Sequence, residues 1–297
     1  MDAVIMMKTQ KMIRKDFCVF ILTHGRADKI STDRTLVKCG YTGPIYYIID
    51  DEDKMADQYR EKYGDAVLMF SKEALEKTFD TCDNFDDRRT PVYARNACFD
   101  FAEQLGYKYF IELDDDYNRF YYKFDNDLIY RGRYIHSLDD VLNTIIEYFI
   151  STKMLSIAFS QGGDFIGGNA GTGAESITLK RKAMNSFICA TDRRFEFTGK
   201  MNDDVNTYVG LGNKGDLFFT TNHIDLKQRK TQQSSGGITE LYLKYGTYVK
   251  SFYTVMLQPS SVIISSLAES CNIRLHHKIK WNLTVPKILR ESVKKYA

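Results

Sequence analysis

Short apolar runs alternate with amphipathic stretches up to residue 113, and this alternation constrains the fold more than any other feature. Runs at 17–23, 45–49, 66–70 and 109–113 have the length of strands, and the stretches at 30–38, 54–63 and 93–106 have helical spacing. Strands that alternate with helices form parallel sheets, and near-continuous apolar strands are buried on both faces. The sequence therefore predicts an α/β fold with a mostly parallel, Rossmann-type sheet flanked by helices.

Beyond residue 117 the pattern is less regular. Aromatic and basic residues dominate 117–134, a helix is expected over 138–152, and a glycine-rich stretch covers 161–173. The glycines lack the spacing of a phosphate loop, so we interpret them as turns beside a functional site.

Charge and cysteine content limit the class of protein. The 41 Lys and Arg residues against 39 Asp and Glu give a net charge of +2, so a nucleic-acid partner must be argued from local patches. Six scattered cysteines form no CxxC pair, which favours a reduced, cytoplasmic protein. An apolar segment of about 18 residues is absent from the sequence, so we expect neither secretion nor membrane insertion.

Three consecutive carboxylates follow the apolar run at 109–113. Asp114 and Asp116 lie two residues apart in chain that begins extended, so their side chains should project to one side while Asp115 points elsewhere. Two carboxylates on one side suit Mg²⁺ or Mn²⁺ that bridges to a diphosphate. A solvated acidic turn is the alternative, but three like charges at a strand end are costly without a counter-ion.

Other polar residues end the first two strands. Thr23 is the last residue of the first run, His24 and Arg26 come after it, and Asp50 and Asp51 follow the second run. Because the carboxyl ends of parallel strands open onto one edge of the sheet, these side chains should lie beside the triple aspartate. There the carboxylates could contact a nucleoside and Arg26 a phosphate, although solvated loops remain the alternative.

Four further positions are candidates for the site. Arg95 and Asn96 lie near the start of their helix, where a diphosphate would be favoured. Asp203 or Asp204 could act as a general base for a hydroxyl acceptor, or could cap a helix, and the sequence does not choose between the two.

Histidines occur late in the chain. His276 is the candidate for a metal ligand in preference to His277, although a structural role is the alternative for both.

In this order, the motifs resemble the TET-associated glycosyltransferase family, relatives of the base J glucosyltransferase that act on hydroxymethylated pyrimidines in DNA. The segments that carry the resemblance are Phe20–Arg26, Lys38–Gly43, Tyr47–Asp53, Tyr93–Phe99, Tyr109–Tyr117, Gly199–Val205 and Arg274–His277.

The resemblance implies a GT-A fold, a nucleotide-sugar donor such as a UDP-sugar, and attack by the hydroxymethyl oxygen of a 5-hydroxymethylpyrimidine. Asp114 and Asp116 then become the metal-binding DxD pair, Asp115 a possible donor-sugar contact, and Asp50 and Asp51 part of the nucleoside pocket. We expect a catalytic, nucleotide-sugar-binding domain over 1–235 and a C-terminal segment over 236–297 that completes the site, unless both form one domain.

A base inside a duplex cannot present its 5-substituent to a deep pocket without distortion, unless the enzyme reaches through the major groove or flips the base. A DNA acceptor therefore predicts aromatic and basic residues that lie together. The candidate segments are 117–124 with Arg131 and Arg133, 227–233, and 274–295. Two alternatives remain: a GT-A transferase for a polysaccharide or protein acceptor, and a non-catalytic reader of modified DNA.

Overall fold

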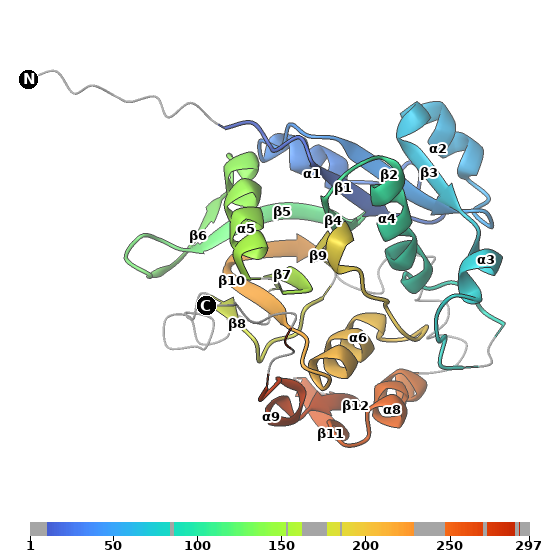
Figure 1. Ribbon diagram of the computed structural model, residues 1–297, viewed down its shortest axis with the longest axis vertical. Coiled ribbons are helices and arrows are strands. Elements are labelled where there is room, and N and C mark those ends of the chain that lie inside the picture. The colour runs from blue at the N-terminus through green and yellow to red at the C-terminus, as the bar shows by residue number, and fades with distance from the viewer. Residues whose placement is uncertain are drawn as a thin grey trace, which may run out of the picture.

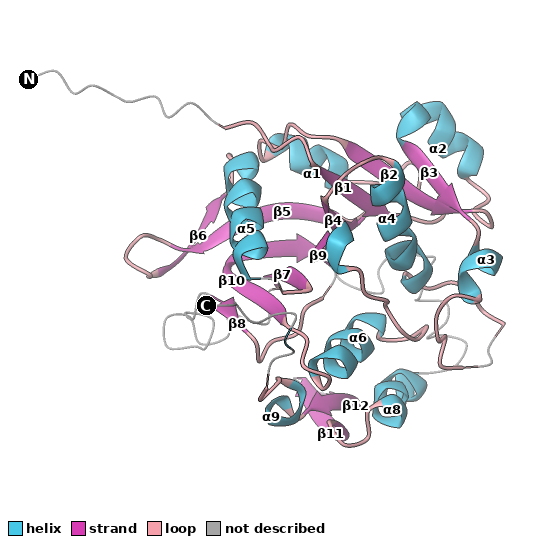
Figure 2. Ribbon diagram, in the orientation of Figure 1, coloured by secondary structure: helices cyan, strands magenta, loops and turns pink. Residues whose placement is uncertain are grey.

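The central feature of the protein, in a computed structural model, is a mixed β-sheet with helices on both faces (Figures 1 and 2). The structure describes residues 11–83, 86–152, 154–161, 177–184, 186–228, 247–269, 272–288 and 291. The strands of this sheet are β1 Phe17–Leu22, β2 Ile45–Asp50, β3 Val67–Phe70, β4 Tyr109–Asp114, β5 Tyr117–Phe124, β6 Tyr130–Tyr134, β7 Ser156–Ser160, β8 Ile177–Thr178, β9 Ser186–Ala190 and β10 Phe218–Gln228.

The first four strands form the parallel part of the sheet, in the order β3-β2-β1-β4. Leu22 of β1 is in register with Ile48 of β2 and with Asp114 of β4. The carboxyl ends of these strands are therefore nearly level, which places their loops along one edge. The predicted α/β fold with its parallel strands is confirmed.

Residues of β1 pack alternately into two cores, one on each face of the sheet. Val19 and Ile21 belong to one core, whereas Cys18 and Phe20 belong to the other. The first core also contains residues of α1 (Thr32–Lys38), α2 (Ala56–Tyr63) and α5 (Leu138–Thr152), and the second contains residues of α4 (Val92–Gln104) and α6 (Asp203–Gly212). Burial on both faces explains why the strand is a continuous apolar run. The short helix α3 (Lys72–Glu76) packs against α4.

The second half of the sheet mixes directions. Strand β9 is antiparallel to β4 and β7, β10 is parallel to β7, and β5 is antiparallel to β10 and β6. The aromatic and basic stretch 117–134, for which the sequence predicts no definite element, forms the β5–β6 hairpin at one end of the sheet. The glycine-rich stretch falls outside the described residues from Gly162 onwards.

The C-terminal part contains α8 (Thr247–Leu257), the β11–β12 hairpin (Val262–Glu269 and Asn272–Ile279) and α9 (Trp281–Thr284). It packs against α6, as Figure 1 shows. Asn202 Nδ2 donates to the carbonyl of Lys250 at 2.8 Å, which joins the start of α6 to α8. The division at residue 235 stays a prediction. Among the described helices, none has the length and apolar character needed to cross a membrane.

Candidate functional site

The three aspartates lie where β4 turns into β5. Asp114 is the last residue of β4, and Asp115 and Asp116 form the turn. Along β4, Phe110 belongs to the core on the α4 side and Ile111 to the opposite core. Because side chains alternate along a strand, Glu112 and Asp114 face α4 together with Phe110.

Arg95 of α4 meets these two carboxylates. Its side chain is 2% exposed, and its guanidinium nitrogens lie 3.6 Å from Glu112 Oε2 and 3.7 Å from Asp114 Oδ1. Its Nε lies 2.8 Å from Oδ2 of Asp203, the first residue of α6. The ring faces of Phe187 and Phe197 lie 5.0 and 5.5 Å from the guanidinium carbon. One buried cation therefore joins three carboxylates from β4 and α6, which we call the Arg95 cluster.

The cluster carries more acidic groups than the arginine can neutralise. Burial raises the pKa of Glu112 well above its ordinary value, and the pKa of Asp114 rises to about 7 through burial and repulsion by Asp116, Asp115 and Asp203, against the opposing effect of Arg95. Burial and repulsion by Asp204 raise the pKa of Asp203 to about 6, although Arg95 lowers it. Such a site gains stability from a proton or an added cation.

Asp114 and Asp116 are close neighbours, as Gln228 shows. Gln228 Nε2 donates to Asp114 Oδ2 at 3.2 Å, and a hydrogen bond from the same side chain partly offsets the effect of burial, which raises the pKa of Asp116. Asp116 Oδ1 is buried and accepts no hydrogen bond within the described part of the chain. An acceptor oxygen of this kind is suited to a cation.

Asp115 points away from this pair. Its Oδ2 accepts a hydrogen bond from Thr23 Oγ1 at 2.8 Å, and its Oδ1 one from Arg26 Nη1 at 3.0 Å. Tyr59 completes the network, because its hydroxyl lies 2.8 Å from Thr23 Oγ1 and accepts the Arg26 N–H. The structure thus brings predicted residues Thr23, Arg26 and Asp115 together and fixes the loop after β1 to the acidic turn.

The end of β2 forms a second polar group. His24 Nδ1 lies 2.6 Å from Asp50 Oδ2, and Lys72 Nζ lies 2.9 Å from Asp50 Oδ1. Burial would raise the pKa of Asp50, but its hydrogen bonds with His24 and Lys72 lower it below its ordinary value. Asp51 is exposed, and one of its oxygens accepts the Lys72 N–H. Of the two aspartates, Asp51 is the more accessible to a ligand.

Asn96 has a different role from the one predicted. Its amide donates to the carbonyl of Phe197 at 3.0 Å and accepts the N–H of Phe197 at 2.8 Å. These two bonds hold α4 to the segment before α6. Asn96 therefore positions its neighbour Arg95, and its amide is already engaged by protein groups.

Asp204, the second candidate base, lies beside Asp203 at the start of α6. It is partly buried, and its Oδ1 accepts the N–H of Val205 at 2.8 Å. Asp203, in contrast, shares Arg95 with Asp114. The structure therefore brings Asp203 to the acidic cluster more directly than Asp204.

His276 lies in β12, in the C-terminal hairpin. Its Nε2 lies 3.4 Å from Lys182 Nζ, and its ring is 4.3 Å from that of His277. Neither neighbour belongs to the Arg95 cluster. Ligation by His276 stays a prediction, and the structure shows no contact that supports it.

The residues present fit a divalent cation that has few protein ligands. No group of three or more His, Cys, Asp or Glu side chains within the described residues is arranged to hold a metal by itself. Mg²⁺ and related hard cations commonly take one or two carboxylates and complete their shell with water and substrate phosphates. Asp114 and Asp116, with the unsatisfied Asp116 Oδ1, meet that requirement.

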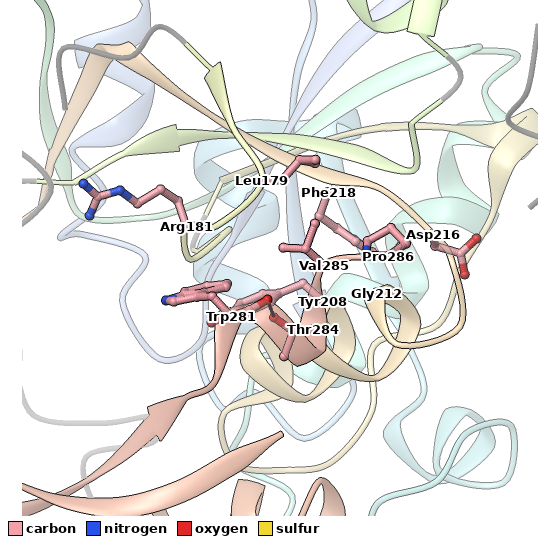
Figure 3. A pocket seen from close by; sticks show the side chains of 10 residues that line it. All are labelled: Leu179, Arg181, Tyr208, Gly212, Asp216, Phe218, Trp281, Thr284, Val285 and Pro286. Carbon is pink, nitrogen blue, oxygen red and sulfur yellow. Dashed lines mark hydrogen bonds between the residues drawn. The ribbon is translucent and has the colours of Figure 1, made fainter. Parts of the chain in front are cut away.

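A separate cleft of about 290 Å³, including space open to solvent, lies beside the C-terminal half of α6 (Figure 3). Tyr208 and Trp281 stack there with ring centroids 6.0 Å apart. None of the ten residues that line it is a predicted site residue: Leu179, Arg181, Tyr208, Gly212, Asp216, Phe218, Trp281, Thr284, Val285 and Pro286.

Sequence reasoning missed Glu112, Gln228 and Lys72. A charged residue inside the apolar run at 109–113 was a usable signal for Glu112, because strands buried on both faces rarely carry one without a partner. Gln228 comes from β10, more than 100 residues from Asp114, and the local pattern contains no signal for that contact.

Comparison with known proteins completes the description of the site. Among solved structures, the chain is similar to glucosyl-3-phosphoglycerate synthase from Mycobacterium tuberculosis, which was crystallised with Mn²⁺, UDP and phosphoglyceric acid. The two share 6% identity and a TM-score of 0.44 over 89% of this chain and 86% of the other. No match was found among curated proteins. A model of the TET-associated glycosyltransferase family matches residues 17–237, and this chain therefore belongs to the TET-associated glycosyltransferase family.

Proposed function

We propose that the protein transfers a sugar from a nucleotide-sugar, a UDP-sugar in our assignment, to the hydroxymethyl oxygen of a 5-hydroxymethylpyrimidine in DNA. Family membership supports the sugar transfer. The observation that carries the site is the Arg95 cluster beside Asp116 at the carboxyl end of a parallel strand, where Asp116 Oδ1 has no hydrogen-bond partner among the described residues.

Asp114 and Asp116 would hold Mn²⁺ or Mg²⁺. When bound, the cation would neutralise the charge that develops on the departing nucleoside diphosphate. Two side chains hold Asp114 in place: Arg95 of α4 by an ion pair and Gln228 of β10 by a hydrogen bond. These contacts fix the carboxylates before the donor arrives, which reduces the reorganisation needed in the transition state.

The donor would lie along the edge formed by β2, β1 and β4. Adjacent strands are about 4.8 Å apart, so the ends of β2 and β4 are separated by roughly 10 Å. That span lets a nucleoside contact Asp51 while its diphosphate reaches Asp114 and Asp116. Arg26 and His24 lie in the loop between these points, where a cation or an N–H can contact phosphate.

Asp203 is our choice for the general base. Two observations support this choice: Arg95 contacts both Asp203 and Asp114, and the Asp203 pKa of about 6 lies near neutral pH, where a base accepts protons efficiently. It would take the proton from the hydroxymethyl oxygen as that oxygen attacks the anomeric carbon. Asp204 is the comparison residue for this role.

Transfer of labelled sugar tests the proposal. The protein is incubated with Mn²⁺, a panel of labelled UDP-sugars and DNA that contains 5-hydroxymethylcytosine or 5-hydroxymethyluracil. We expect Asp114→Asn and Asp116→Asn each to lower the rate by at least about 100-fold, and chelation to do the same. Asp57→Asn, at a fully exposed position on α2, is the matched control. Undiminished transfer in both site variants would exclude the metal assignment.

A further inference from the structure

Two like charges face each other on the exposed surface of β5 and β10. Arg119 of β5 is in register with Lys227 of β10, and both side chains are exposed. Within the described residues, no carboxylate forms an ion pair with either one. Like charges directly opposite each other destabilise an antiparallel pair. An anionic partner would remove the repulsion.

Aromatic rings continue this surface toward the edge of the sheet. The Arg119 guanidinium lies about 6 Å from the rings of Tyr121 and Tyr134, and it donates a 2.8 Å hydrogen bond to the Tyr121 hydroxyl. Tyr121 and Tyr134 face each other across β5 and β6 with centroids 4.7 Å apart. Tyr134 is 48% exposed and Tyr130, further along β6, is 37% exposed. The exposed rings of Tyr134 and Tyr130 therefore extend the surface from Arg119 and Lys227 toward the edge of the sheet.

The surface begins at the candidate active site. Gln228, which donates to Asp114, directly follows Lys227, and Arg119 comes three residues after Asp116. At about 3.3 Å per residue along a strand, the two cations are roughly 10 Å from the acidic turn. A ligand bound to this surface would therefore lie directly beside a group bound at Asp114 and Asp116.

Protection of a sheet edge does not explain these charges. Lysine and arginine on edge strands prevent pairing with other chains, but β10 and β5 are interior strands that have partners on both sides. Tyrosines exposed at the edge would also be a poor device for that purpose. The pattern of cations followed by exposed rings instead matches a platform for nucleic acid, in which arginine and lysine contact phosphates and rings stack on bases.

We propose that the surface formed by Arg119, Lys227, Tyr121, Tyr134 and Tyr130, the β5 surface, holds a single-stranded stretch of DNA next to the acceptor base. Arg119 and Lys227 contact its phosphates, and Tyr134 stacks on a base. This inference rests on the proposed function for the identity of the acceptor. It adds where on the protein the strand lies.

Fluorescence anisotropy with a labelled single-stranded oligonucleotide that contains 5-hydroxymethylcytosine tests the β5 surface without any turnover. The double variant R119A/K227A should bind about tenfold more weakly at low salt. The slope of log affinity against log salt should become shallower by about 1.4, because two phosphate contacts are lost at about 0.7 each. Its thermal midpoint should change little, since the repulsion that the substitution removes offsets the lost contacts of Arg119 with Tyr121 and Tyr134.

The matched control is R60A/K77A, which removes two exposed cations, one in α2 and one directly after α3, beside the opposite end of the sheet. It should bind like the wild type. Tyr134→Ala should weaken binding at least about fivefold and Tyr134→Phe should not, since phenylalanine keeps the stacking face. Wild-type affinity and salt slope in R119A/K227A would overturn the assignment of the surface.

The two proposals fail in different ways. If these variants weaken DNA binding but no sugar reaches the DNA, the β5 surface stands and the acceptor assignment falls. If sugar is transferred to DNA while R119A/K227A binds with unchanged affinity, the acceptor assignment stands and the β5 surface falls.

Discussion

Arg95 Nε lies 2.8 Å from Asp203 Oδ2, so one buried ion pair joins α4 to the first residue of α6. The same guanidinium approaches Asp114 at the end of β4. One positive charge therefore holds both Asp114, a proposed metal ligand, and Asp203, the proposed base.

Replacement of that charge should destabilise the fold. Arg95→Met removes the cation but leaves buried carboxylates, and breaking a buried pair in this way costs about 3–5 kcal/mol. Denaturant titration at pH 7 measures the free energy of unfolding. Arg60→Met, on the exposed surface of α2, is the control and should cost less than about 1 kcal/mol. A loss below 1 kcal/mol in Arg95→Met would show that the cluster is not held by its charge.

Glu112 should tolerate replacement by glutamine. Its side chain is fully buried, and burial raises its pKa well above the ordinary value, so we expect the neutral acid in the folded state. Glu112→Gln keeps the shape of the neutral acid and should change the free energy of unfolding by less than about 1 kcal/mol. Denaturant titration of Glu112→Gln, in parallel with Arg95→Met, measures this change in the free energy of unfolding. A loss as large as that of Arg95→Met would mean that Glu112 is ionised.

Much of this fold follows from the pattern of the sequence, since apolar runs and helical stripes report burial directly. The strand at 17–23 is β1, the helix at 93–106 is α4, and Gly106 adopts the left-handed conformation expected after a helix end (φ 78°). The β5–β6 hairpin was not predicted, because its outer surface lacks a regular alternation of apolar and polar residues.

Residue types at the strand ends predicted that these polar side chains would lie along one edge of the sheet, but not how they would pair. Asp115 accepts hydrogen bonds from Thr23 and Arg26, and Asn96 accepts one from Phe197. All three partners are distant in sequence, so the local pattern does not reveal them. The pairing of Arg95 with Asp203 depends on how α6 packs against the sheet, and the spacing of residues along the chain does not predict that packing. Of the basic segments, 229–233, 289–290 and 292–295 lie outside the described residues.

Gln228 should support the carboxylates that we propose as metal ligands. Its amide donates to Asp114 at 3.2 Å, and loss of such an outer partner typically costs 10- to 100-fold in metal affinity or activity. We expect Gln228→Ala to raise the Mn²⁺ concentration needed for half-maximal transfer by about tenfold. Gln58→Ala, at an exposed position on α2, is the control. An unchanged Mn²⁺ requirement would remove Gln228 from the site.

His277 should make the fold sensitive to acid. Burial lowers its pKa to about 3, and both ring nitrogens lack hydrogen-bond partners within the described structure. The unfolded chain therefore binds the proton more readily between about pH 3 and 6.5, and stability falls as pH decreases through that window. His277→Phe should abolish about 3 kcal/mol of this loss between pH 7 and pH 4, as measured by denaturant titration. Equal acid sensitivity in both proteins would contradict the role of His277.

The central claim is that the hydroxymethyl oxygen of a pyrimidine in DNA accepts the sugar. Mass spectrometry of nucleosides, released from DNA after incubation with Mn²⁺ and UDP-sugars, tests it directly when DNA with 5-hydroxymethyl, 5-methyl and unmodified pyrimidines is compared. We predict that only the 5-hydroxymethyl nucleoside gains the mass of a sugar, and that Asp203→Asn greatly reduces the gain while Asp57→Asn does not. Absence of the gain from 5-hydroxymethyl DNA with every donor, or an equal gain in 5-methyl DNA, would contradict the claim.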